Sequence, residues 1–185
     1  MPLDPRLLNQ VLHAPLDVDV GESPIVTAIV LRDPANAEAL VPFLDEPDGA
    51  AAVHARQILC RFDRSAVPGV MRALAEGDRS ADGRASGLDV LWSILLGERP
   101  HTIRAVWREA AVEARTLLDD RRPIPDRAPS FVERDFQGRV CDRAYLVIAQ
   151  SMNRTMDVSE FRASDDDARD REIRRLDRRV FGGIV

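Results

Sequence analysis

Two stretches of the sequence share one layout: Ala37–Phe62 (AEALVPFLDEPDGAAAVHARQILCRF) and Val67–Leu95 (VPGVMRALAEGDRSADGRASGLDVLWSIL). Each has an apolar block with helical spacing, then an acidic turn that contains glycine or proline, then a second apolar block with helical spacing. Matching positions lie 30 residues apart before the turn and 32 apart after it, as in Leu44/Leu74 and Leu59/Leu91. The internal repeat therefore predicts two helical hairpins and an all-α fold of stacked antiparallel helical hairpins.

The second helix of each copy has one apolar side and one polar side. Small residues, Ala55 and Gly87, lie on the apolar sides, where they would let neighbouring helices approach closely. The polar sides carry, in the first copy, His54, Gln57 and Arg61 and, in the second, Asp82, Ser86, Asp89 and Ser93.

Weaker helical patterns extend this layout along the chain. Apolar spacing predicts a helix from about Thr102 to Leu118 and another from about Gly138 to Met152. The proline-rich linker between them, residues 119–130, cannot be helical throughout, and we expect it to cross the surface. We expect one domain over residues 1–185, made of an N-terminal cap (1–32), hairpins at 33–63 and 64–97, an irregular third hairpin (98–157) and a C-terminal capping helix (158–185).

The sequence predicts secondary structure less clearly near the N-terminus than near the C-terminus. Pro5–Leu12 predicts a short helix, whereas residues 17–30 are compatible with either an extended segment or a helix. The last helix is expected to begin after Ser164 as its N-cap, with acids in its first turn. Acid-before-base pairs four residues apart would support it: Asp165–Arg169, Asp167–Arg171 and Asp170–Arg174.

The two copies resemble HEAT repeats, the helical hairpins that stack into an α-solenoid. Arg84 occupies the place of the basic residue that opens the second helix in that family, whereas the first copy has Ala52 there and the third hairpin has Cys141. The resemblance implies that the second helices line one surface, which in this family usually holds another protein. A mixed-charge partner-binding face is then expected from His54, Gln57, Arg61, Asp82, Ser86, Asp89, Arg143 and Gln150. The alternative is that this stripe is only a solvated helix face.

Charge and composition exclude several classes of protein. The chain has 185 residues, 45% hydrophobic and 31% charged, and its net charge is −5. All 26 basic residues are arginine, and residues 1–50 alone carry two arginines against nine acids. The acidic balance disfavours a nucleic-acid partner, and no apolar run approaches the roughly 20 residues that span a bilayer. Two cysteines without a C-x-x-C pair, Cys60 and Cys141, fit small core residues of a cytoplasmic protein.

No motif of known chemistry is present in the sequence. His13, His54 and His101 are isolated from one another, so no metal site is expected, and no glycine-rich loop indicates a nucleotide or another cofactor. No nucleophile motif indicates a catalytic residue. The acid pairs, such as those at Asp45 and Asp119, fall at turns, where capping explains them. An aromatic and basic patch is conceivable, but core packing is the favoured role of its tryptophans; its residues are Trp92, Trp107, Arg104 and Arg108.

These observations favour a non-enzymatic protein-binding scaffold. Its most specific form is a bacterial immunity-type protein that neutralises a basic toxin by direct binding, with the acidic N-terminal quarter covering a cationic site. One alternative is a HEAT-like enzyme or ligand-binding protein, similar to chromophore lyases or to DNA glycosylases; the latter would use Asp89, Trp92 and Trp107. Another alternative is a structural adaptor subunit of a larger complex that docks through the 119–130 linker.

Overall fold

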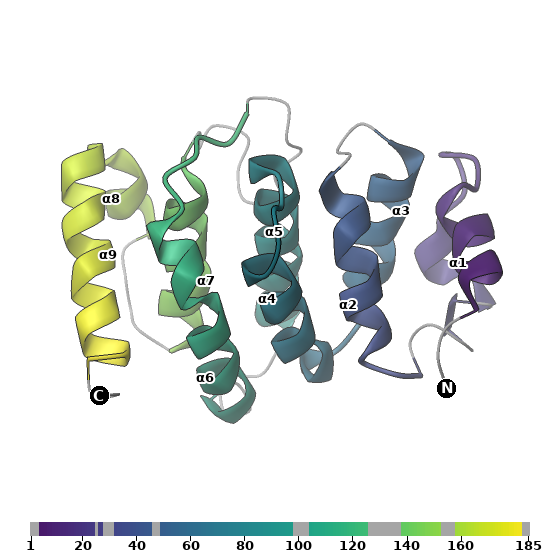
Figure 1. Ribbon diagram of the computed structural model, residues 1–185, viewed down its shortest axis with the longest axis horizontal. Helices are drawn as coiled ribbons and strands as arrows, with labels where there is room; N and C mark the ends of the chain where they lie inside the picture. Colours follow the sequence, from purple (N-terminus) through teal and green to yellow (C-terminus); the bar gives the residue numbers. More distant parts are fainter. Residues whose placement is uncertain are drawn as a thin grey trace.

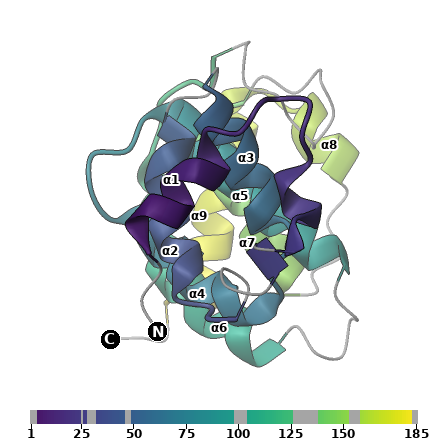
Figure 2. The ribbon, with the colours of Figure 1, turned by 90° about the vertical axis from the view of Figure 1, so that its right-hand side faces the viewer.

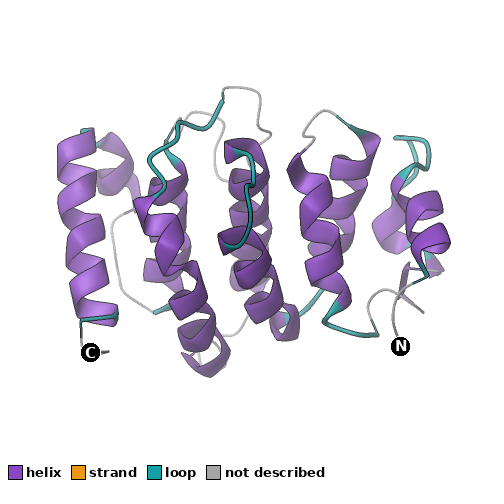
Figure 3. Cartoon of the chain, viewed as in Figure 1, coloured by secondary structure: helices purple, strands orange, loops and turns teal. Residues whose placement is uncertain are grey.

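A computed structural model of the chain describes residues 4–24, 26–27, 32–45, 49–97, 104–125, 138–152 and 158–182. Throughout these ranges the chain forms helices and loops (Figure 3), and in place of strands there is one isolated bridge between Pro123 and Arg139. The all-α prediction is therefore confirmed for the described residues. The longest helix has 17 residues, and no helix in this part of the chain has both the length and the apolar character needed to cross a bilayer.

Nine α-helices and several 3-10 turns make up the described part of the chain. In order they are α1 (Pro5–Leu12), η1 (Val20–Glu22), α2 (Asn36–Leu40), η3 (Val41–Asp45), α3 (Ala50–Leu59), η4 (Arg64–Ala66), α4 (Val67–Ala75), α5 (Ala81–Gly97), α6 (Arg104–Glu113), η5 (Ala114–Asp119), α7 (Val140–Ser151), α8 (Val158–Ala163) and α9 (Asp166–Val180).

The helices lie in two neighbouring rows that run from α1 at one end to α9 at the other (Figure 1). In one row α4 packs between α2 and α6, and in the other α5 packs between α3 and α7. Helix α1 packs against α3 at one end, seen in front in Figure 2, and α9 packs against α7 at the other end (Figure 1). Helices α2 to α7 each contact a helix next to them in sequence and another helix two places away.

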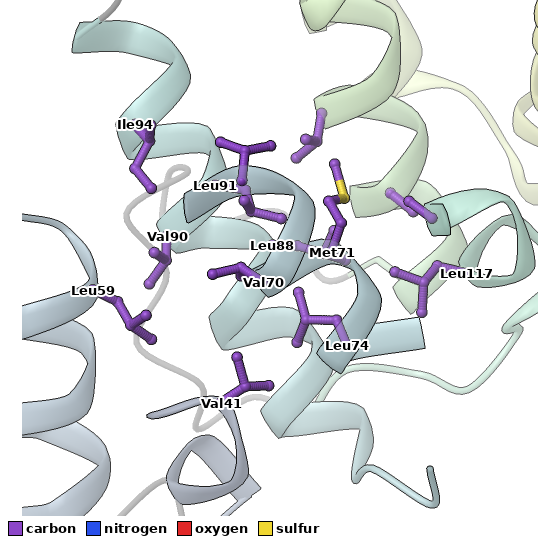
Figure 4. Close-up of a cluster of buried hydrophobic side chains, with 14 of the residues drawn as sticks. Val41, Leu59, Val70, Met71, Leu74, Leu88, Val90, Leu91, Ile94 and Leu117 are labelled. Carbon is purple, nitrogen blue, oxygen red and sulfur yellow. The ribbon is translucent and has the colours of Figure 1, made fainter. Parts of the chain in front are cut away.

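One continuous hydrophobic core runs between the two rows. Its centre is formed where α4 faces α5, with Leu59 of α3 and Leu117 of η5 at its edges (Figure 4). Helices α5 and α7 are the most deeply placed, since every residue from Ala85 to Leu91 and from Val140 to Ala149 is buried. This explains why polar residues within these two helices need partners inside the protein.

Two of the expected helices form where the sequence places them. Helix α1 spans Pro5–Leu12, and the Asp4 side chain caps it by accepting from Arg6 N at 2.9 Å. Helix α7 falls within the expected 138–152 range. The helix expected from Thr102 to Leu118 differs, because α6 ends at Glu113 and the chain continues as the 3-10 turn η5. Thr102 itself lies outside the described residues.

The expected cap of the last helix is wrong by one residue. Asp165, not Ser164, caps α9 by accepting from Ala168 N at 2.7 Å. Ser164 Oγ instead donates to Glu160 O at 2.8 Å, which closes the end of α8. In the ambiguous 17–30 segment, the structure contains the short turn η1, capped by Asp19.

Some acids of α9 pair with arginines elsewhere in the protein, and others pair along the helix itself. Asp170 accepts from Arg139 Nη2 at 2.8 Å and also pairs with Arg121. Arg169 pairs with Asp166, three residues before it. Because Arg121 follows η5 and Arg139 precedes α7, the ion pairs of α9 attach it to the body of the protein rather than merely supporting an isolated helix.

The start of the 119–130 linker is anchored, whereas the sequence predicts a segment that simply crosses the surface. Ile124 is 6% exposed, and its N–H donates to Gly138 O at 3.0 Å. Val140 N donates to Arg122 O at 3.1 Å, so this strip is tied directly to the first turn of α7. Residues 126–130 lie outside the described part of the chain.

Gly87 allows α5 to approach α4 closely, as the sequence predicts. A β-carbon built at Gly87 would lie 2.7 Å from Leu74 Cδ1, well inside van der Waals contact. Leu74 is fully buried, so its side chain has no free space into which it can turn. The close distance between α4 and α5 therefore depends on the absence of a side chain at Gly87.

We expect Gly87→Ala to lower the free energy of unfolding by about 1–2 kcal/mol, because overpacking outweighs the gain of about 1 kcal/mol in helix propensity. In a Leu74→Ala background the same change should raise it, since the clash is absent and the methyl group fills part of the cavity. Urea unfolding of the four proteins of this cycle, followed by far-UV circular dichroism, measures both values. An equal effect of Gly87→Ala in the two backgrounds would contradict the packing account.

The turns at one end of the helices are joined by a set of ion pairs that we call the Asp–Arg ladder: Asp45, Arg79, Arg84, Asp120 and Arg122. Asp45 accepts from Arg79 Nη1 and from Ser80 N, each at 2.9 Å. Asp120 accepts from Arg84 Nη1 at 2.6 Å and from Arg122 Nη2 at 2.8 Å. Arg122 Nη1 in turn donates to Arg79 O at 2.9 Å. The acids of these turns therefore bridge successive helix pairs, which goes beyond the expected capping role.

The electrostatics of Asp120 follow from this position. Burial opposes its ionisation, but hydrogen bonds from Arg122 and Arg84 outweigh burial and lower its pKa to about 2. A carboxyl whose pKa falls on folding stabilises the folded state above its unfolded pKa, and this stabilisation disappears as the pH drops towards 2.

We expect Asp120→Asn to lower the free energy of unfolding by about 2 kcal/mol at pH 7, since it removes charge-assisted hydrogen bonds to two arginines. The neighbouring Asp119→Asn is the matched control, because Asp119 is exposed, and it should change stability by less than about 0.5 kcal/mol. Guanidinium unfolding between pH 7 and pH 2 should show the gap between wild type and Asp120→Asn closing below about pH 4. A gap that persists at pH 2 would count against the ladder.

Candidate functional site

The eight residues expected on one open face divide between the interior and the surface. Gln57 and Asp82 are half-buried, and Arg61 and Gln150 are exposed. The other four are buried, namely His54, Ser86, Asp89 and Arg143. The expected mixed-charge partner-binding face does not extend to these four, because α1 covers α3 and because α5 and α7 pack against each other where Asp89 meets Arg143.

His54 connects α3 to the N-terminal helix. Its ring is fully buried, and Nδ1 lies 2.9 Å from the carbonyl oxygen of Leu12, the last residue of α1. This contact supplies a partner to a carbonyl at a helix end, where no partner is available within the helix itself. His54 therefore holds the cap in place and does not reach a partner protein directly.

Asp89 and Arg143 form a buried ion pair between α5 and α7. Arg143 Nη1 lies 2.5 Å from both carboxylate oxygens, and the two residues are 2% and 5% exposed. Burial raises the pKa of Asp89 to about 6, although Arg143 and Arg56 attract its charged form. A carboxylate so placed is held by its partner and is not available as an open catalytic acid.

Arg56 is a buried charged residue that the helical pattern misses. It is 7% exposed, and its Nη1 is buried without a hydrogen-bond partner. Burial lowers its pKa, while attraction to Asp89 opposes that effect. One signal in the sequence points to it, since an arginine at position 56 lies between Ala55 and Gln57 and so borders the apolar side of α3.

A pocket of about 460 Å³ opens beside Arg56, and we call it the Arg56 pocket. Its walls come from Asp19 and the 3-10 turn η1 that follows it, from α3 and the two residues after it, and from Ser93 of α5. Arg61 and Glu22 form an ion pair at its rim. The lining residues are Asp19, Gly21, Glu22, Val53, Arg56, Gln57, Cys60, Arg61 and Ser93.

The chemical groups of this pocket are suited to binding. Burial raises the pKa of the Cys60 thiol, so it stays protonated at neutral pH and is a weak nucleophile. Ser93 Oγ donates to the carbonyl oxygen of Asp89 at 3.1 Å. The amide oxygen of Gln57 is buried and has no partner. The pocket therefore offers a guanidinium, an amide oxygen and an apolar wall.

The cysteines occupy different environments. Cys141 is fully buried, and burial raises its pKa to about 12. Its position confirms the expected core role, whereas Cys60 is only half-buried and lines the Arg56 pocket. Both thiols are free. Within the described ranges, no group of three His, Cys, Asp or Glu side chains lies where it could hold a metal ion.

The aromatic and basic patch does not form. Trp107 is fully buried, as core packing predicts, and Trp92 is half-buried beside the Asp89–Arg143 pair. Arg108 is exposed, and the side chain of Arg104 is outside the described part of the structure. Of the three residues of a glycosylase-like site, Asp89 and Trp107 are buried and Trp92 is half-buried.

The segment that borders the pocket is acidic and carries exposed apolar side chains. Leu16 is 60% exposed and Val18 is 44% exposed. Asp17 and Asp19 alternate with them, and both of these acids are exposed. We call residues 16–22 the acidic segment; it contains η1 and so contributes directly to the wall of the Arg56 pocket.

No protein-family model matches the chain, and no curated protein or solved structure matches it either.

The raised pKa of Asp89 makes stability depend on pH in a defined direction. Its pKa is about 6 in the folded protein against an ordinary 3.8, so folding takes up a proton between these values. The corresponding stabilisation is complete below about pH 4 and is lost as the pH rises through 6. Over that range it amounts to roughly 3 kcal/mol.

We therefore expect the free energy of unfolding of wild type, relative to Asp89→Asn, to increase by roughly 3 kcal/mol between pH 7 and pH 4. Urea unfolding at four pH values in that interval measures the difference, and it cancels the titration of all other groups. Asp17→Asn, which removes an exposed acid, is the control and should show a nearly constant difference. A difference for Asp89→Asn that stays flat or shrinks on acidification would rule out this assignment.

Proposed function

We propose that the chain is a non-enzymatic protein-binding module that holds a basic partner protein at its N-terminal end. The observation that carries this proposal is the acidic segment, in which exposed Leu16 and Val18 alternate with exposed Asp17 and Asp19. Apolar side chains in such a setting supply contact area, and the surrounding acids select and steer a cationic surface.

The charge distribution also favours the N-terminal end as the contact site for a basic partner. Residues 1–50 hold nine acids and two arginines, whereas the rest of the chain is nearly neutral. In the α9 region, Asp170 is already engaged with Arg121 and Arg139. Asp17 lies exposed at the N-terminal end, and Glu22 is exposed there beside its partner Arg61, so an approaching cationic protein would be attracted to this end.

The arrangement of helices supports a HEAT-like repeat as the scaffold. Helix α4 packs between α2 and α6, and α5 packs between α3 and α7, so each pair is covered by the pairs beside it. Arg84, the residue in the position of the family's basic residue, bonds to Asp120 in the turn of the next pair. Such contacts between neighbours are the means by which repeat proteins bury their apolar sides.

An immunity-type role is the most specific form of this proposal. A small protein that neutralises a toxin needs no catalytic group and acts by covering a cationic active site with an acidic surface. Two free thiols, one of them fully buried, fit the reducing cytoplasm in which such a protein would act.

The test compares two matched pairs of substitutions in a capture experiment with extract of the organism that encodes the chain. Leu16→Ser with Asp17→Asn alters the acidic segment, and Val112→Ser with Glu113→Gln alters an exposed apolar and acidic pair on α6. We expect wild type and the α6 variant to retain the same basic protein, and the acidic-segment variant to lose it. The purified complex should bind in a 1:1 ratio by calorimetry.

Salt provides a second readout of the same contact. The dissociation constant should rise at least about tenfold between 50 and 500 mM salt, because the Debye length falls from roughly 14 Å to about 4 Å. Three results would refute the proposal: equal binding by the acidic-segment variant, equal loss in the α6 variant, or an affinity that salt does not change.

A further inference from the structure

The Arg56 pocket contains a buried positive charge that the protein leaves unmatched. Asp89 is the carboxylate whose negative charge attracts Arg56. Both oxygens of Asp89, however, already accept from Arg143 Nη1 at 2.5 Å. Arg56 Nη1 has no hydrogen-bond partner. Two buried guanidinium groups therefore face a single carboxylate, and a buried cation without a full set of acceptors is costly.

The acids at the rim of the pocket do not supply the missing partner. Asp19 Oδ1 accepts from Gly21 N at 3.0 Å, which shapes the start of η1. Glu22 pairs with Arg61, on the outer side of the pocket. Each of these acids is engaged with a different group, so the guanidinium of Arg56 has no carboxylate partner of its own.

A second unused polar atom lies on the adjacent residue. The Gln57 amide oxygen is buried, lines the same pocket and has no partner. The pocket thus presents a donor group for an anion and an acceptor for an N–H or O–H group, next to the apolar surface of Val53 and Cys60. Its volume of about 460 Å³ lies in the range of pockets that hold small ligands.

We propose that the Arg56 pocket binds a small carboxylate of about amino-acid size, with the carboxylate on Arg56, a neighbouring N–H or O–H donor on Gln57, and an apolar body against Val53 and Cys60. Arginine suits this ligand because its planar donors match the two oxygens of a carboxylate.

A carboxylate fits the pocket better than a phosphate. One unmatched guanidinium balances a single negative charge, whereas a phosphate dianion would need further donors and would meet Asp19 and Glu22 at the rim. This site does not depend on the protein partner proposed above, since its ligand is held by α3 and not by the exposed side chains of Leu16 and Val18.

The test is a titration of the ¹⁵N-labelled protein, followed by the backbone amide signals of Gly21, Val53 and Ser93. N-acetylglycine and N-acetylleucine are the probes, and N-acetylglycinamide is the neutral isostere that keeps the N–H donor. We expect saturable shifts with a dissociation constant on the order of 1 mM for N-acetylleucine. The amide should cause none, and inorganic phosphate should bind more weakly than the carboxylates.

Two substitutions examine the residues assigned to the ligand. Arg56→Gln removes the cation, and Gln57→Glu places a carboxylate of the protein itself beside Arg56. Each should weaken binding of N-acetylleucine by roughly tenfold or more. Gln150→Glu, the same change at an exposed position of α7, is the control and should leave binding unchanged. If Arg56→Gln does not fold, Gln57→Glu alone decides the question.

Each outcome has a fixed meaning. Equal shifts with the acid and its amide, tighter binding of phosphate, full affinity in Gln57→Glu, or an absence of saturable shifts in wild type would each overturn the proposal. Binding of carboxylates without capture of any basic protein would support this site while refuting the proposed partner, so the two proposals fail separately.

Discussion

The burial of α5 on nearly all sides is the constraint on which the rest of the structure depends. This helix contacts α3, α4, η3 and α7, and Gly87 is what lets α4 come close enough to close one of those contacts. Between Ala85 and Leu91, where every residue is buried, this helix cannot send polar side chains to water. Asp89 must therefore be matched inside the protein, and Arg143 of α7 is the residue that matches it. The same demand explains why Ser93 bonds to a backbone carbonyl of its own helix.

At the ends of the helices, arginine side chains connect turns that a lysine could not connect in the same way. Arg122 bonds to Asp120 through two nitrogens and donates from a third to the carbonyl oxygen of Arg79. Arg139 similarly contacts both Asp142 and Asp170. A planar guanidinium can join two groups in this way through separate nitrogens, whereas a lysine ammonium acts as a compact point charge. The ladder and the attachment of α9 both depend on that geometry, whatever caused lysine to be absent.

Helical periodicity is enough to predict the helices, but it does not predict which of their polar sides are covered by other helices. The spacing of Val70 and Leu74 predicts a helix because it depends only on the local chain, and α4 forms there. Whether a polar stripe meets water depends instead on the packing of other helices, which no local pattern encodes. The pattern places His54 towards solvent, yet it is buried because α1 folds back over α3. It misses Arg56 for the same reason, since α5 and η1, both distant in sequence, set the environment of that residue.

The pocket and the acidic segment share one wall. Residues of η1 border the Arg56 pocket on one side and continue into exposed Leu16 and Val18 on the other. An anion bound at Arg56 would add an acceptor behind η1, where the Arg61–Glu22 pair and the Asp19 cap hold the segment in place. Filling the pocket would therefore stabilise the bound conformation of η1 relative to any opened one, because a ligand stabilises the state that binds it. The acidic segment and the buried cation of α3 therefore have η1 as their common element.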